Sequence, residues 1–150
     1  IISLLLFFTL SAFIFDRNAY SVSGEVSFPG SGDIYMYLMT EDEYTASAEK
    51  KNVGMPWDSL RFIVIRLTEK QKFSRRVPFK FVGIPPGRYY IECFQDVNKN
   101  GRMDPLLERP FAATARPEPW GGYRIRGSRN WHDINFLVDE NVSDIYIYAG

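Results

Sequence analysis

The sequence predicts an all-β fold, a seven-stranded antiparallel β-sandwich. Short runs in which apolar and polar residues alternate recur along most of the chain, with Gly, Pro, Asn and Asp between them. No window of eleven or more residues carries the apolar stripe of an amphipathic helix. The 12 Phe and 9 Tyr residues concentrate in runs that also contain Ile and Val, which are residues that favour strands. Seven strands of this length suit two packed sheets.

Alternation also indicates which side chains face the core of this sandwich. The expected strands are 20–28, 33–40, 61–68, 77–82, 88–95, 132–138 and 143–149. The side chains expected inside are Ile34, Met36, Leu38, Ile63, Ile65, Leu67, Phe79, Phe81, Tyr89, Ile91, Ile134, Phe136, Val138, Ile145 and Ile147. Burial of this many large apolar groups would offset chain entropy without a metal or a disulfide, since each is worth roughly 1.5 to 3 kcal/mol.

Two longer connections interrupt the strands. Residues 41–59 read as a polar surface insertion, in which a short helix over 46–51 ends before Gly54 and Pro56. Residues 105–131 are rich in proline, which disfavours a continuous strand, so only a short edge strand over 122–126 is expected there.

The N-terminal segment predicts export. Residues 1–15 carry no charge and only three hydroxyl side chains, which is typical of the apolar part of a secretory signal. Ala19-Tyr20-Ser21 would serve as a cleavage site, and the segment falls short of the roughly 20 residues that span a bilayer as a helix. Because neither Met nor a basic leader precedes it, we expect further residues upstream. We therefore expect a signal segment over 1–21 and one domain over 22–150, located in the periplasm, at the cell surface or secreted, with membrane contact only through an uncleaved signal.

Composition and rare residue types exclude several function classes. Lys plus Arg and Asp plus Glu are 18 each, so no net charge attracts nucleic acid. Cys93 is the sole cysteine and alternates with strand residues, which indicates a small buried side chain. His132 is the sole histidine, which excludes zinc sites built from several His or Cys ligands. A triad of Ser128, His132 and Asp133 has poor geometry, since neighbours in one strand point to opposite faces. We expect no enzymatic activity.

The loop 96–104 resembles the front half of a calcium loop, with oxygen-bearing side chains at positions 1, 3, 5 and 9 and glycine at position 6. The candidate ligands are Asp96, Asn98, Asn100, Asp104 and Glu108 through side-chain oxygens and Arg102 through its carbonyl. Leu107 stands where a bidentate Glu is expected and Glu108 comes one residue late, so affinity should be weak. Two readings stay open, since Asp and Asn would equally stabilise a plain turn in which Gly101 has a positive φ. Calcium is the one cofactor that the sequence suggests.

An aromatic and basic loop follows. Its candidate ligand-binding residues are Trp120, Tyr123, Arg124, Arg126 and Trp131. Such side chains stack on sugar rings or anchor a protein partner. They equally fold back over a sheet edge, with Arg stems lying on the rings, and both readings stay open.

Three motifs carry a family resemblance. They are Gly24-Glu25-Val26, the turn Ile84-Pro85-Pro86-Gly87-Arg88-Tyr89, and Gln95-Asp96 followed by Asn98, Asn100 and Gly101. In the turn, Pro86 fixes the first angle and Gly87 is expected to supply the positive φ of a type II turn. Over 23–148 the chain resembles transthyretin-like and carboxypeptidase-regulatory-like β-sandwiches, closest to an uncharacterised exported bacterial family with a PPGxY…DxNxNG core. The resemblance implies a prealbumin-like or Ig-like Greek key at the cell envelope, and no known activity.

The functional expectation combines these signals. It is an exported, non-enzymatic binding or structural module with an unknown protein or glycan partner at the cell envelope, and a calcium site at 96–104. The alternative is a carbohydrate- or peptide-binding accessory domain that uses the aromatic and basic loop between Trp120 and Trp131.

Overall fold

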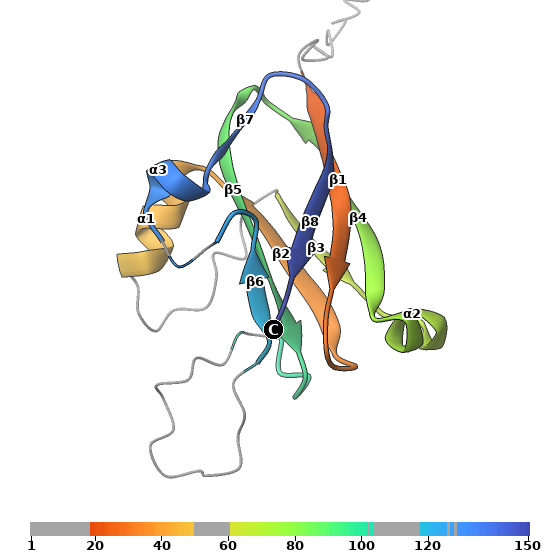
Figure 1. Ribbon diagram of the computed structural model, residues 1–150. Coiled ribbons are helices and arrows are strands. Elements are labelled where there is room, and N and C mark those ends of the chain that lie inside the picture. Colours follow the sequence, from red (N-terminus) through yellow and green to blue (C-terminus); the bar gives the residue numbers. More distant parts are fainter. Residues whose placement is uncertain (1–18, 50–60, 102, 104–117, 126, 128) are drawn as a thin grey trace, which may run out of the picture.

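The computed structural model describes residues 19–49, 61–101, 103, 118–125, 127 and 129–150. Two sheets face each other (Figure 1). One has the order β4 (Arg76–Ile84), β1 (Tyr20–Ser27), β8 (Val142–Tyr148). The other has the order β3 (Phe62–Ile65), β2 (Asp33–Met39), β5 (Gly87–Asp96), β6 (Trp120–Gly122), and β7 (Phe136–Val138) pairs with the start of β5. The prediction of an all-β fold with two sheets is confirmed.

The strand count and pairing differ from the expectation of seven antiparallel strands. The described residues form eight strands, because the short edge strand β6 adds to the seven; it spans Trp120–Gly122, whereas 122–126 was predicted. β1 and β8 pair in parallel, since the chain enters β8 from the opposite sheet by way of β7. At Gly24 a Cβ atom would lie 1.9 Å from the carbonyl oxygen of Ile145. The backbones of β1 and β8 therefore approach each other more closely here than a side chain at position 24 would permit.

The main core fills the space between the sheets. Twelve of the fifteen side chains predicted to face inward are buried members of this cluster, among them Ile34, Met36 and Leu38, each fully buried. Ile63 and Ile65 are partly buried against the same cluster, whereas Ile134 belongs to a second cluster on the outer face of the five-stranded sheet. Apolar burial therefore extends over both faces of that sheet.

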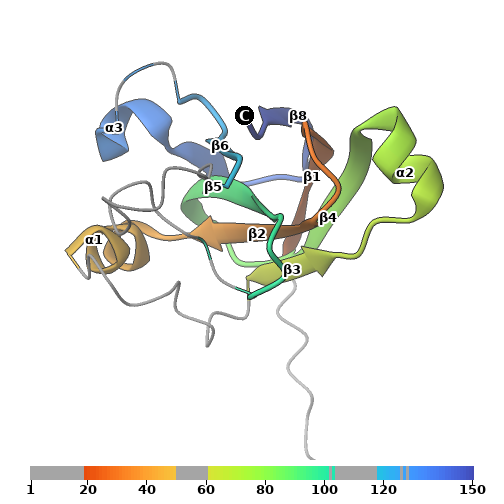
Figure 2. The ribbon, with the colours of Figure 1, turned by 90° about the horizontal axis from the view of Figure 1, so that it is seen from below.

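Three short helices flank the sandwich. α1 (Glu41–Glu49) and α3 (Trp131–Ile134) lie together on one side and α2 (Glu69–Ser74) lies on the other (Figure 2). α1 begins at Glu41, earlier than the predicted 46–51, because Thr40 and Glu43 exchange the two hydrogen bonds of a capping box. α3 occupies the first half of the predicted strand 132–138, since the Asn130 side chain accepts from the His132 amide and starts a helical turn.

The turn before β5 corrects one expectation. Gly87 does not have a positive φ; the left-handed residue here is Gly83, with a φ of 70°. The Tyr89 hydroxyl donates to the Pro85 carbonyl oxygen at 3.0 Å, which holds the turn against the strand. Within the described part of the chain, no helix has the length and apolar character needed to cross a membrane. Residues 1–18 of the expected signal segment 1–21 and residues 50–59 of the expected insertion lie outside the described residues, whereas Tyr20 and Ser21 begin β1.

Candidate functional site

Two tyrosines stand on the outer face of the three-stranded sheet. Ile145 and Ile147 of β8 point into the core, so Tyr146 and Tyr148 point outward, where they are 51% and 62% exposed. Large exposed rings that neighbour each other are a feature of binding surfaces. We call the surface formed by Tyr146, Tyr148 and the adjoining Tyr123 and Arg124 the tyrosine face.

A shallow hollow lies on each side of Tyr146. One has a volume of about 740 Å³ and lies along β1, β4 and β8, where Ser23, Lys80 and Ser143 contribute to its lining. The other has a volume of about 780 Å³ and lies between β8, α3 and the turn after β6, where Arg124 and Asp133 contribute. Each hollow is of the size that protein ligand sites occupy, and both are open to solvent.

Both exposed rings are held in place. The Tyr146 hydroxyl and the buried Ser27 hydroxyl share a hydrogen bond of 2.7 Å. The Tyr148 ring lies against the backbone of Gly150, where a Cβ atom would come within 2.1 Å of it. Arg124 is oriented as well, because it donates to the Asn135 carbonyl oxygen at 3.2 Å and lies 5.3 Å from the centre of the Tyr123 ring. The tyrosine face is therefore preorganised.

The structure separates the predicted aromatic and basic residues. Trp131 is buried in α3 at 8% exposure and packs in the second cluster. Trp120 is partly buried in the same cluster, with the Arg129 guanidinium 4.5 Å from its ring centre. Tyr123 packs edge-on against Phe136 and lines the second hollow together with exposed Arg124. Arg126 lies outside the described residues. Burial favours packing over ligand contact for Trp131.

The second cluster contains a carboxylate that the sequence reasoning missed. On the outer face of the five-stranded sheet, Glu92 stands directly across from Tyr37 on one side and from Gly122 on the other. The aromatic rings of this cluster include Tyr90 and Phe94, its neighbours two residues away on the same strand. The signal was available, since Glu92 stands between Tyr90 and Phe94 in the outward alternation of β5.

The environment of Glu92 perturbs its ionisation. Burial raises the pKa of Glu92 to about 7, although a hydrogen bond from the Tyr90 hydroxyl and the charge of Arg129 both lower it. Burial, followed by the Glu92 charge, raises the pKa of Tyr37, whose hydroxyl is buried with no hydrogen-bond partner. Glu92 is therefore a destabilising charge at neutral pH, and it lines neither of the two hollows beside Tyr146.

The loop after β5 has the hydrogen bonds of an Asx-stabilised turn. The Asp96 carboxylate is buried and accepts from the amides of Asn100 at 3.1 Å and Gly101 at 2.9 Å. Asn98 accepts from the same Asn100 amide, and Gly101 has the predicted positive φ, at 74°. Glu118, also buried, accepts from the Val97 amide at 3.0 Å and ties the loop to the chain before β6.

The calcium prediction for this loop stays a prediction. Arg102, Asp104 and Glu108 lie outside the described residues. In the part of the chain that is described, no three His, Cys, Asp or Glu side chains gather where they would hold a metal ion. Backbone amides already donate hydrogen bonds to the side-chain oxygens of Asp96 and Asn98. A cation would therefore bind these oxygens through their remaining lone pairs.

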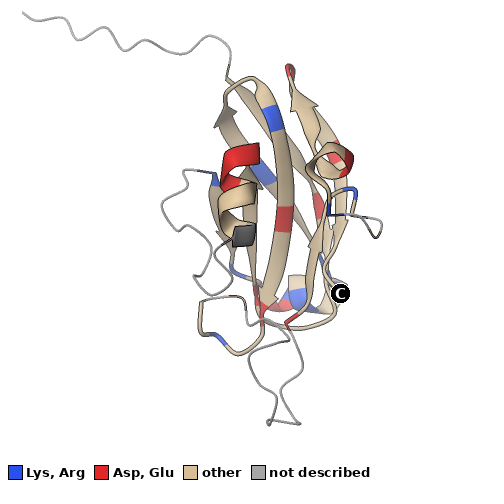
Figure 3. Cartoon of the chain, turned by 90° about the vertical axis from the view of Figure 1, so that its left-hand side faces the viewer, with Lys and Arg blue, Asp and Glu red and all other residues tan. Residues whose placement is uncertain are grey.

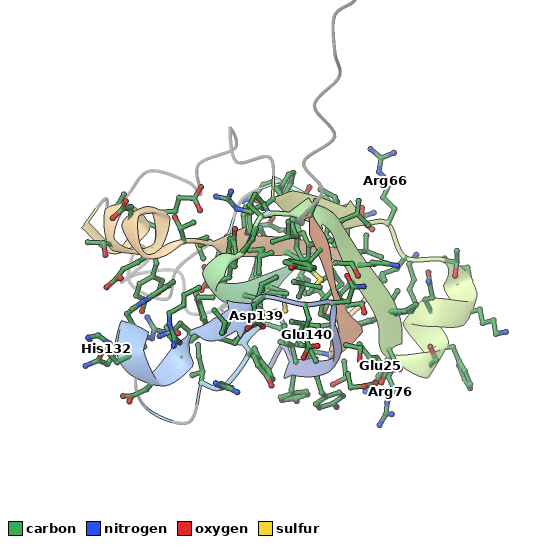
Figure 4. All side chains as sticks on the ribbon, turned by 90° about the horizontal axis from the view of Figure 1, so that it is seen from above. Glu25, Arg66, Arg76, His132, Asp139 and Glu140 are labelled. Carbon is green, nitrogen blue, oxygen red and sulfur yellow. The ribbon has the colours of Figure 1, made fainter. Side chains whose placement is uncertain are left out.

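The other reactive residue types take structural positions. His132 is exposed in α3 and points away from the sandwich (Figure 4). Ser128 lies outside the described residues. Burial raises the pKa of the Cys93 thiol to about 12, which keeps it protonated and unreactive. Charges of both signs are interspersed along the described chain (Figure 3).

No family model, no curated protein and no solved structure matches the chain.

Proposed function

We propose that this chain is an exported, non-enzymatic binding module of the transthyretin-like type, with the prealbumin-like Greek key that the sequence motifs suggest, and that its ligand binds at the tyrosine face. The observation that carries the proposal is the pair Tyr146 and Tyr148, exposed and fixed between two hollows. Tyrosine supplies a large amphipathic contact area at a low cost in side-chain entropy.

Sequence features support the location and the lack of catalysis. The apolar stretch 1–15 is typical of a secretory signal, and export is consistent with a chain that has one buried cysteine and no need for a reducing compartment. The single histidine, His132, is exposed on α3. The ligand would be held at the surface and released unchanged.

Binding to arrays of oligosaccharides and of peptides tests this proposal. We expect the chain to bind a subset of one array, and the double variant Tyr146→Ala/Tyr148→Ala to lose that signal while its melting temperature stays within a few degrees of the parent. Mass spectrometry of the recovered ligand should show it unaltered. A signal that survives the double substitution would place binding elsewhere, and a cleaved ligand would contradict the non-enzymatic role.

A further inference from the structure

We propose that the ligand of the tyrosine face is an uncharged polysaccharide, bound with sugar rings stacked on Tyr146 and Tyr148. This inference rests on the proposed function and specifies its ligand class. It uses the residues of β8 and the two hollows, whereas Trp120 and Trp131 serve packing.

The first step is the spacing and direction of the rings. Residues two apart on a strand are separated by about 6.8 Å and share one face of the sheet. Tyr146 and Tyr148 therefore present two platforms side by side, both exposed by more than half. A pyranose ring matches such a platform, since one of its faces is built from C–H groups and its rim carries hydroxyls. Two adjacent platforms suit successive units of one chain better than a single sugar.

The second step is rigidity. Ser27 is 8% exposed, so its hydrogen bond to the Tyr146 hydroxyl is shielded from water. Tyr148 is held against Gly150. A weakly bound, hydrated ligand gains most from rings that lose no freedom on binding, because ordering costs are subtracted from every contact.

The third step is the charge of the hollows. Charged side chains of both signs line each hollow: Glu25, Asp144 and Lys80 in one, and Arg124 with Asp133 in the other. Glu25 is also paired with Arg76 at 3.4 Å, and the two lie together in Figure 4, so Arg76 offsets the extra acidic charge of the first hollow. With the charges offset in this way and small hydroxyls such as Ser23 and Ser143 present, the surface favours a neutral hydroxyl-rich ligand over a phosphate, an acidic polymer or nucleic acid.

The fourth step is shape. Tyr146 borders both hollows, so a ligand that lies across it reaches into each. Both hollows are open and neither encloses an apolar pocket that would anchor a peptide side chain. Peptides that bind sheets by strand addition pair with the backbone at a sheet edge, such as the free edge of β8, whereas the rings and hollows here lie on the face of the sheet. The surface therefore suits a long, polar, extended chain.

Affinity electrophoresis in native gels tests the inference. The full chain is run through gels that contain a soluble β-glucan, a mannan or a dextran, and through a gel that contains alginate as an anionic polymer. We expect at least one neutral polysaccharide to retard the chain and alginate to leave its mobility unchanged. Tyr146→Ala and Tyr148→Ala should each weaken binding about tenfold or more, and Tyr148→Phe, which keeps the ring, within about twofold.

Two further variants separate ring stacking from general stickiness. Phe73→Ala removes an aromatic ring that is 91% exposed on α2, which contacts β4 at the opposite edge of the sheet from β8, and should leave retardation unchanged. Ser27→Ala releases the Tyr146 ring without removing it, and should weaken binding by less than Tyr146→Ala does. Melting temperatures of all variants verify that they fold.

The outcomes distinguish this inference from the proposed function. Absence of retardation by every neutral polysaccharide, or equal loss in Phe73→Ala, overturns the polysaccharide assignment. If peptides bind in a manner that depends on Tyr146 and Tyr148 while glycans do not, the assignment falls and the binding module stands. If neither class binds through these tyrosines, both fall.

Discussion

Replacing Glu92 with Gln should stabilise the protein at neutral and alkaline pH and do little at acidic pH. The folded protein holds the Glu92 proton with a pKa of about 7, against an ordinary value of 4.5. The folded state binds this proton more tightly than the unfolded state does. Protonation of Glu92 therefore stabilises the fold; this contribution is complete below pH 4.5 and is lost as the pH rises to about 7. Gln retains an acceptor for the Tyr90 hydroxyl and cannot ionise.

The magnitude follows from the pKa shift. At about 1.36 kcal/mol per pKa unit, the shift corresponds to about 3 kcal/mol at most, and the partial exposure of Glu92 reduces this to about 2 kcal/mol. We define the offset as the Tm of Glu92→Gln minus the Tm of the parent. For a chain of this size, this offset should be about 4–8 °C larger at about pH 8 than at about pH 5.

Thermal unfolding followed by circular dichroism across this pH range measures the effect. Glu140→Gln is the matched control, since it removes an exposed carboxyl in the turn between β7 and β8 and so measures the effect of losing one surface carboxyl. If the offset of Glu92→Gln from the parent is the same at both ends of this pH range, Glu92 is not a buried acid with a raised pKa and the explanation given for the second cluster is wrong.

Three further predictions concern Gly121 in β6, Trp131 in α3 and the loop after β5. Gly121→Ala should lower stability by about 3 kcal/mol or more in urea unfolding, since its Cβ atom would lie 1.9 Å from the Tyr148 carbonyl oxygen where β6 meets β8; parental stability would refute this close approach. Trp131→Ala should cost about 3 kcal/mol or more because its ring is buried, and an unchanged Tm with lost ligand binding would instead make Trp131 a contact residue. The calcium hypothesis for 96–104 predicts a higher Tm when millimolar Ca²⁺ is added to a metal-stripped sample, and an unchanged Tm ends it.

Period-two alternation was enough to predict the sandwich core. The inward members of β2, β4, β5 and β8 are all buried, because alternate side chains of a strand lie on the same face of its sheet. Helices were harder to predict, since α2 has six residues and no buried face. Its signal was Thr68 followed by Gln71, which form a capping box in the structure. The parallel pairing of β1 with β8 has no local signal, because the two strands are far apart in the sequence.

The residues predicted to form a ligand site lie apart in the structure. Tryptophans in a Pro-rich loop suggest ligand contact, yet Trp131 is buried once α3 forms, whereas Tyr123 and Arg124 line the second hollow. The same alternation that placed Ile145 and Ile147 inside also placed Tyr146 and Tyr148 outside, so the tyrosine face could have been found from the sequence. Its two hollows could not, because they depend on how β8 meets the turn after β6.

Amide chemical-shift mapping by NMR tests the central claim, that the ligand binds at the tyrosine face, most directly. The ¹⁵N-labelled chain is titrated with the glycan or peptide that binds most tightly in the arrays. We predict that the largest shift changes fall on residues 143–148 and 122–125, which line the hollows beside Tyr146. Changes confined to α3 around Trp131, or to the loop after Asp96, would contradict the account.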